Sequence, residues 1–167
     1  MNELTVATEP TAALAEPAEY LSFRLGDEEY GIGILQVQEI RSYEEPTKIA
    51  NAPAVLRGVI DLRGVITPIV DLRLAFNQPA PCTGLTGVIV LNLGGRVVGI
   101  VVDAVSDVVE LGAEQIRPAP RLSAPGFDTS FVTGIATLQQ RLLILMDIAR
   151  LLDNPALGLA GAMPSAA

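Results

Sequence analysis

Two stretches of this chain each occur twice, and this repetition is the strongest constraint on what it can fold into. The first pair is Leu25–Ile40 (LGDEEYGIGILQVQEI) and Leu93–Val108 (LGGRVVGIVVDAVSDV), and the second pair is Gly58–Arg73 (GVIDLRGVITPIVDLR) and Gly134–Ala149 (GIATLQQRLLILMDIA). Both pairs align without gaps and keep glycines and apolar residues in register. Such a repeat predicts one small structural unit made twice, so a feature found in only one copy is a candidate for function.

The apolar residues come in short runs separated by glycine and proline, which predicts strands. Half of the 167 residues are apolar, and 15 are glycine and 12 proline. Runs such as Val97–Val102 and Leu142–Met146 are far shorter than the ~18 residues that a membrane-spanning helix needs. Short strands punctuated in this way are typical of an all-β sandwich or barrel. We expect two small β-barrels packed together, because a barrel of about 60 residues buries too little surface to be secure alone.

Local signals predict several turns and short helices. Arg63-Gly64 and Gly94-Gly95 are expected to form tight hairpins, because glycine permits positive φ. Leu35–Ile40 fits either one helical turn or a further strand. Helical turns are expected at three places, namely after an Asn51 cap through Leu56, from Asp71 to Phe76, and in a C-terminal helix Asp147–Asp153 capped by Asp147.

The composition leaves little with which to build a catalytic site. The chain has no histidine, the usual general base and metal ligand, and its only cysteine is Cys82 in the linker 77–85. The carboxylates of Asp103, Asp107 and Glu110 lie close in sequence, but this spacing fits the solvated face of a helical turn as well as a cation site. We therefore expect no enzymatic activity, no metal and no cofactor, and a function in binding other proteins.

The charge and the N-terminal segment exclude further classes. A net charge of −8 makes nucleic acid an unfavourable partner and counts against an oligonucleotide-binding barrel, because binding a polyanion needs cationic side chains. The first 20 residues, MNELTVATEPTAALAEPAEY, lack the basic region and apolar core of a signal peptide. We expect a cytoplasmic protein with no direct membrane insertion.

Arg63 is the sharpest difference between the two copies, since Arg63-Gly64 aligns with Gln139-Gln140. A tight turn would lift the guanidinium away from the sheet, and arginine is favoured at interfaces because its fork binds carboxylates. A solubilising hairpin charge is the simpler explanation. Negative and positive side chains also alternate along this stretch, at Asp61, Arg63, Asp71 and Arg73. They could form local ion pairs, which would contribute little to stability if exposed.

Four long motifs, in this order, resemble the CheW family, the coupling proteins of bacterial chemotaxis arrays. They are LGDEEYGIGILQVQEIR (Leu25–Arg41), TKIANAPAVLRGVIDLRGVITPIVDLR (Thr47–Arg73), VIVLNLGGRVVGIVVDAVSDVV (Val88–Val109) and AEQIRPAP (Ala113–Pro120). The resemblance covers about residues 20–153. It implies an all-β fold of two five-stranded SH3-like barrels packed across a hydrophobic seam, with short helical turns and a short C-terminal helix.

The expected domain spans residues 19–153. We place the first barrel at about residues 30–85 and the second at about 86–140, with the terminal segments completing both. Residues 1–18 and 154–167 are expected to be tails, the first of them flexible.

The resemblance also implies a function. Proteins of this family are adaptors without enzymatic activity that link the cytoplasmic tip of methyl-accepting chemoreceptors to the histidine kinase CheA, and they are recruited to membrane arrays in which other CheW-like proteins are ring partners. By position, the implied receptor contacts are Val37, Glu39, Arg63 and Ile66. The implied contacts with the regulatory domain of CheA are Ile40, Gly58, Arg117 and Leu122.

The chain departs from the family pattern in two places. Asp61 stands where Asn is common, and an ionised Asp cannot donate a hydrogen bond. Arg121-Leu122 stands where an acidic residue and Phe are expected. Two related alternatives remain open. The chain could be related to the regulatory domain of the kinase, which shares the fold. It could also be a CheW-like module that controls a kinase of a non-chemotaxis pathway, such as motility or surface sensing.

Overall fold

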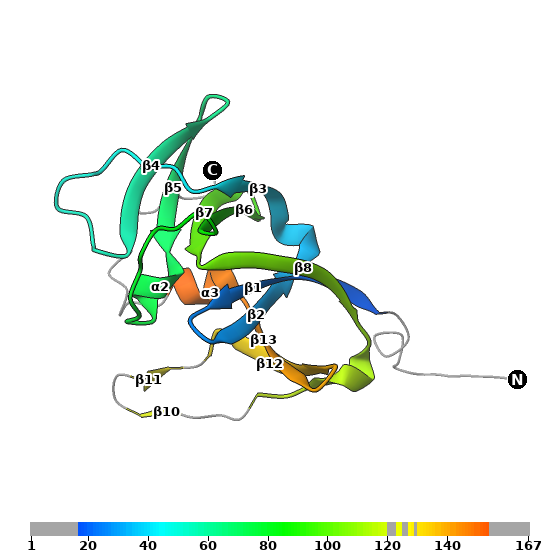
Figure 1. Ribbon diagram of the computed structural model, residues 1–167. Helices are drawn as coiled ribbons and strands as arrows, with labels where there is room; N and C mark the ends of the chain where they lie inside the picture. Colours follow the sequence, from blue (N-terminus) through cyan, green and yellow to red (C-terminus); the bar gives the residue numbers. More distant parts are fainter. Residues whose placement is uncertain (1–16, 120–122, 125–126, 129, 154–167) are drawn as a thin grey trace, which may run out of the picture.

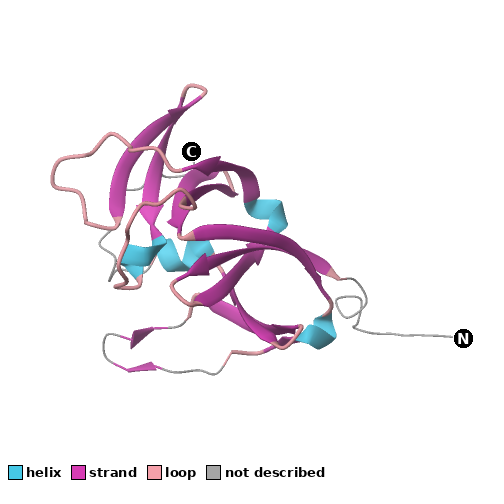
Figure 2. Cartoon of the chain, in the orientation of Figure 1, coloured by secondary structure: helices cyan, strands magenta, loops and turns pink. Residues whose placement is uncertain are grey.

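The computed structural model describes residues 17–119, 123–124, 127–128 and 130–153 and shows two curved β-sheets packed against each other (Figures 1 and 2). The six-stranded sheet has the order β8-β1-β2-β13-β12-β9 and the five-stranded sheet the order β3-β6-β7-β5-β4. Few and short helices accompany them, so the expected all-β class is confirmed.

The strands are short, as the sequence pattern predicted. The six-stranded sheet consists of β1 (Ala18–Leu25), β2 (Glu28–Gly33), β8 (Ala104–Leu111), β9 (Ile116–Arg117), β12 (Val132–Leu138) and β13 (Arg141–Met146). The five-stranded sheet consists of β3 (Val37–Ser42), β4 (Leu56–Leu62), β5 (Val65–Asp71), β6 (Gly87–Leu93) and β7 (Arg96–Val102). The remaining elements are η2 (Ile34–Gln36), η3 (Ala113–Gln115), the pair β10 (Ser123–Ala124) and β11 (Phe127–Asp128), α2 (Leu72–Ala75) and α3 (Ile148–Leu152).

The two copies of the repeat exchange their first hairpins. In the five-stranded sheet, β6 pairs with β3 and β7 pairs in parallel with β5. In the six-stranded sheet, β1 pairs with β8 and β2 pairs in parallel with β13, which is the same arrangement with the copies interchanged. Each sheet therefore contains a hairpin from one half of the chain, with three strands of the other half in the five-stranded sheet and four in the six-stranded sheet.

This exchange corrects the expected division of the chain near residue 85. The strands β6 and β7, residues 87–102, complete the five-stranded sheet rather than beginning the second one. They are buried on both faces, because Val88, Val90 and Val101 point to the core within this sheet while Ile89 and Ile100 point to the core between the sheets. A strand that is apolar on both faces is stable only between two layers.

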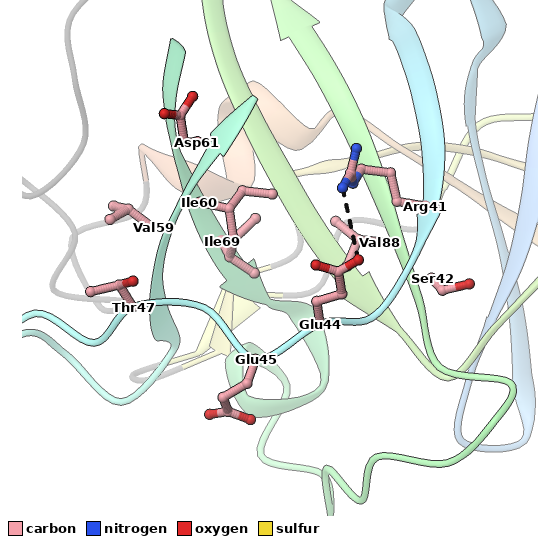
Figure 3. A pocket seen from close by; sticks show the side chains of 10 residues that line it. All are labelled: Arg41, Ser42, Glu44, Glu45, Thr47, Val59, Ile60, Asp61, Ile69 and Val88. Carbon is pink, nitrogen blue, oxygen red and sulfur yellow. Dashed lines mark ion pairs between the residues drawn. The ribbon is translucent and has the colours of Figure 1, made fainter. Parts of the chain in front are cut away.

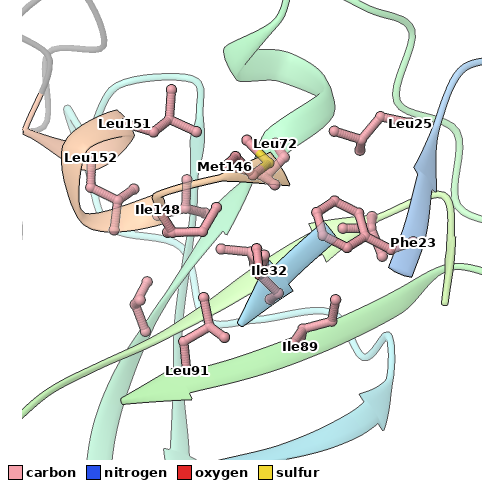
Figure 4. Close-up of a cluster of buried hydrophobic side chains, with 14 of the residues drawn as sticks. Phe23, Leu25, Ile32, Leu72, Ile89, Leu91, Met146, Ile148, Leu151 and Leu152 are labelled. Atoms are coloured by element: carbon pink, nitrogen blue, oxygen red, sulfur yellow. The ribbon is translucent and has the colours of Figure 1, made fainter. Parts of the chain in front are cut away.

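The core between the sheets is the largest apolar cluster, and it draws on both sheets and both helices (Figure 4). Phe23 and Leu25 from β1 and Ile32 from β2 meet Leu72 of α2 and Ile148 of α3, all of them fully buried. A row of stacked rings runs along its border, with centroids 6.0, 5.9 and 5.4 Å apart through Phe23, Tyr30, Phe76 and Phe131. The expected hydrophobic seam is thus a single core that neither sheet could bury alone.

The local expectations had mixed outcomes. Leu35–Ile40 contains both alternatives, since η2 ends at Gln36 and β3 begins at Val37. The backbone amide of Arg150 donates to Asp147, which confirms the predicted cap of α3. The prediction of a helical turn capped by Asn51 was wrong, because Asn51 has a φ of 65° rather than the extended conformation of an N-cap.

A cluster of buried and half-buried charges joins the sheets, and we call Arg57, Asp71, Arg73 and Asp103 the seam cluster. Asp71 and Arg73 are both fully buried and form a two-pronged pair, with Nε–Oδ1 and Nη2–Oδ2 distances of 3.0 Å. Arg57 lies 2.9 Å from the same carboxylate, and Asp103 lies 3.1 Å from Nη1 of Arg73. The alternating signs near Asp71 therefore do produce a local ion pair, but it is buried rather than exposed.

Arg73 keeps its charge in this environment. Burial lowers its pKa, but the hydrogen bonds that Arg73 donates to Asp71 and Asp103 outweigh that cost and hold the pKa above its ordinary value. Nη1 of Arg73 also donates to the carbonyl of Pro81 at 2.6 Å. The guanidinium is thus held by a helix cap, by the linker and by Asp103 at once.

Replacing Arg73 should therefore be costly. We expect Arg73→Met to lower the free energy of unfolding by about 3–5 kcal/mol, because it leaves the buried Asp71 without its main partner. Chemical denaturation followed by circular dichroism measures this change.

Arg150→Met is the matched control, because Arg150 pairs with the cap residue of α3 but is 63% exposed. That exposed pair should contribute less than about 1 kcal/mol. Equal losses for the two variants would show that the seam cluster is not a special determinant of stability.

Candidate functional site

The hairpin of β4 and β5 projects from the five-stranded sheet and carries Arg63 at its turn (Figure 1). Arg63 and Gly64 have φ values of 51° and 90°, the conformation of the tightest hairpins. The backbone N–H of Gly64 donates to Oδ1 of Asp61 at 2.7 Å. This bond needs only an acceptor, so Asp61 serves as well as the Asn that the family commonly has.

The equivalent hairpin in the other copy has the same shape without the glycine. Gln139 and Gln140 have φ values of 50° and 68°. The two copies therefore differ at this turn in side-chain chemistry rather than in backbone conformation, which isolates the arginine as the added feature.

Glu39 on β3 fixes the position of the Arg63 side chain. Its carboxylate forms an ion pair and hydrogen bond with Arg63 through one oxygen, and it lies 3.2 Å from Nη1 of Arg41 through the other. The hydrogen bonds from Arg63 and Arg41 hold the pKa of Glu39 below its ordinary value. Arg63 remains 68% exposed, so most of its guanidinium is available to a partner.

Between β3 and β4, the two edges of the five-stranded sheet, lies a groove of about 230 Å³ (Figure 3). Arg41 and Glu44 lie across one side of it, 4.0 Å apart, and Ile60, Ile69 and Val88 form its apolar floor. The ion pair of Glu39 with Arg63 connects the same two edges. It therefore braces the side of the sheet that strand pairing leaves open.

The four expected receptor contacts are only partly brought together. Glu39 and Arg63 touch, and Ile66 on the same hairpin is 61% exposed. Val37 is half-buried and packs against the core between the sheets. A β-bulge between Val37 and Glu39 gives them neighbouring partners, Leu91 and Val90, whose side chains belong to different cores, so the two residues face opposite sides of β3.

The expected kinase contacts lie on different parts of the molecule. Ile40 on β3 is 49% exposed, and Arg117 is exposed at the end of the short strand β9. Gly58 is buried in β4 with a φ of 145°, and a Cβ there would lie 2.1 Å from the carbonyl oxygen of Thr47, so it can act only through the backbone. Leu122, like its neighbour Arg121, lies outside the described residues.

The importance of Arg41 and Arg73 was missed from the sequence. Arg41 is the second cation on Glu39, and nothing in its local pattern indicated this. Arg73 did carry a signal, because it aligns with Ala149 and is therefore a second charged position present in only one copy.

Among the described residues, no three or more His, Cys, Asp or Glu side chains lie close enough together to hold a metal ion. Nor does any helix among the described residues have the length and apolar character needed to span a membrane.

The brace can be tested by titration. Arg63→Gln should raise the pKa of Glu39 toward its ordinary value of 4.5, because the hydrogen bond from Arg63 is the main cause of the lowered pKa. The folded pKa lies below the unfolded one, so the pair stabilises the fold above the ordinary pKa and is lost as pH falls through the lowered value. Carbon-detected NMR of the Glu39 carboxyl measures the change.

Arg96→Gln serves as the control, since Arg96 pairs with the distant Asp153 at 3.6 Å. An identical Glu39 titration in Arg63→Gln and the unmodified chain would show that the brace does not exist in solution.

Comparison with known proteins places this geometry in a family. The model of the CheW-like domain matches residues 19–156. The chemotaxis protein CheW of Klebsiella aerogenes is 55% identical over 142 residues, covering 84% of this chain and 85% of the relative. A probable chemotaxis protein CheW of Rhizobium etli is 37% identical over 137 residues, covering 81% and 88%.

The crystal structure of the scaffolding protein TtCheW from Thermoanaerobacter tengcongensis superimposes with a TM-score of 0.75 at 31% identity, covering 83% of this chain and 94% of that one. The expected fold of two SH3-like subdomains is thereby confirmed, as is the expectation of a protein that is not an enzyme. The chain belongs to the CheW-like family of chemotaxis scaffolding proteins.

Proposed function

We propose that this chain is an adaptor that couples membrane chemoreceptors to the histidine kinase CheA. The observation that carries the proposal is the braced hairpin, on which an exposed arginine is held in one orientation by Glu39 and stands on the same hairpin as the exposed Ile66. An ordered side chain costs less conformational entropy on binding than a free one.

The receptor surface in this proposal consists of Glu39, Arg63 and Ile66, with Val37 supporting β3 from the opposite face. An exposed isoleucine offers apolar area to a partner, while Arg63 contributes orientation and charge specificity more than affinity. The small size of this surface suits a signalling contact that forms and dissociates, since such interfaces often bury less than about 1,200 Å².

The proposal includes two kinase surfaces. One is the outer face of β3 around Ile40, together with the backbone at Gly58 on β4, the opposite edge strand of the same sheet. The other lies on the six-stranded sheet near Arg117, and we propose Leu122, which lies outside the described residues, as a further kinase contact. Coupling then requires no chemistry, only contacts whose free energies differ between the active and inactive arrays.

In the cell, this function places the chain in the cytoplasm and at membrane receptor arrays, with other CheW-like proteins as ring partners. The net charge of −8 supports protein partners over nucleic acid.

The test reverses the charge of one side chain, Arg63. Arg63→Glu should weaken binding to a chemoreceptor cytoplasmic fragment by about tenfold or more, because it removes the orienting cation and places a carboxylate beside Glu39. Binding to the CheA regulatory domain should be unchanged, and surface plasmon resonance measures both affinities.

Arg141→Glu is the matched control, because Arg141 follows the equivalent hairpin turn and pairs with Glu29 at 2.9 Å. Full receptor binding by Arg63→Glu would overturn the assignment of the surface. If the unmodified chain bound a kinase but no chemoreceptor, the alternative of a kinase-control module in another pathway would be favoured.

A further inference from the structure

The two sheets are joined covalently at only two places within the described residues, η2 and Asp103. The first connection runs from β2 through η2 to β3. The second is a single residue, because β7 ends at Val102 and β8 begins at Ala104. Asp103 is therefore the entire link between a strand of one sheet and a strand of the other.

The side chain of Asp103 bonds to both sheets. Its Oδ1 accepts from Nη1 of Arg73 at 3.1 Å, in the helix α2 that directly follows β5 of the five-stranded sheet. Its Oδ2 accepts from the backbone N–H of Gly26 at 2.7 Å, in the β1–β2 turn of the six-stranded sheet. Its own N–H donates to the carbonyl of Arg24 at 3.1 Å.

Arg73 cannot follow Asp103 if the sheets shift, because its other donors are occupied. Nε and Nη2 hold the buried Asp71, and Nη1 also donates to the carbonyl of Pro81. The apolar core resists separation of the sheets, but the hydrophobic effect has no directionality and tolerates a small rotation. Charge-assisted hydrogen bonds are directional and resist it.

We propose that the Arg73–Asp103 pair fixes the angle between the two sheets, and that this fixed angle transmits a displacement of the receptor hairpin on one sheet to the kinase surface on the other. Both are positioning residues, since they act through the surfaces that they orient and bind no partner themselves. The second part of this inference rests on the proposed adaptor function, with the receptor hairpin on one sheet and the Arg117 surface on the other. The first part concerns the isolated chain and stands on its own geometry.

Asp103→Ala is the informative variant, because it removes the carboxylate bonds to Gly26 and Arg73 while the backbone link and the Arg73–Asp71 pair remain. A pair of spin labels reports the angle, at Ser42→Cys on β3 and Thr137→Cys on β12, both exposed, in a Cys82→Ser background. The distance distribution from pulsed electron resonance should broaden or shift in Asp103→Ala. Asp103→Asn, which keeps one acceptor oxygen, should fall between Asp103→Ala and the unmodified chain.

The functional measurement uses receptor, kinase and the full chain together. Asp103→Ala should keep each separate affinity within about twofold and lower receptor-dependent kinase activation by at least about fivefold. Ser22→Ala is the control, because Ser22 is buried and bonds to the backbone of Asp107 within one sheet, so its loss weakens the fold without touching the link.

Three results would overturn the inference: an unchanged distance distribution, unchanged activation by Asp103→Ala, or an equal loss of activation in Ser22→Ala. If the unmodified chain bound neither partner, the adaptor function would fail instead. The distance measurement on the isolated chain would then still decide whether the pair fixes the angle.

Discussion

The guanidinium of Arg73 is completely buried where the two sheets meet, and the surrounding structure is arranged to satisfy it. Removing a charge from water costs several kcal/mol, so the site requires partners in fixed positions. Asp71 meets it in a two-pronged pair while also capping α2, and Asp103 meets it from the link between the sheets. A helix, a linker and two sheets therefore converge on one side chain, and the positions of the exposed surfaces follow from it.

Exchange of hairpins between the two copies makes the halves dependent on each other. Each sheet lacks two strands until the other copy supplies them, and the largest core draws on both copies. The repeated strands form the two packed sheets, and charged residues present in only one copy make the two copies different. Arg63 against Gln139 marks the hairpin that we propose for the receptor, while Arg73 against Ala149 marks the seam.

The repeat and the turn residues carried enough information to predict two packed β-units, the hairpin at Arg63-Gly64 and the cap at Asp147, because these depend on local sequence. Long-range features could not be predicted in the same way. The partner of β6 and β7 depends on which layers enclose a doubly buried hairpin, so the division near residue 85 was misplaced. A β-bulge reversed the face of Val37 relative to Glu39. The pairing of Glu39 with Arg63, 24 residues apart, also depends on closure of the sheet.

An adaptor must hold two partners at once, so simultaneous binding is the central requirement. Analytical ultracentrifugation of the chain with a chemoreceptor cytoplasmic fragment and the CheA regulatory domain, each with its own chromophore, measures this directly. The proposed receptor and kinase surfaces predict a ternary complex in which both chromophores sediment together with the chain. Displacement of one partner by the other, with only binary complexes at every ratio, would contradict the adaptor function.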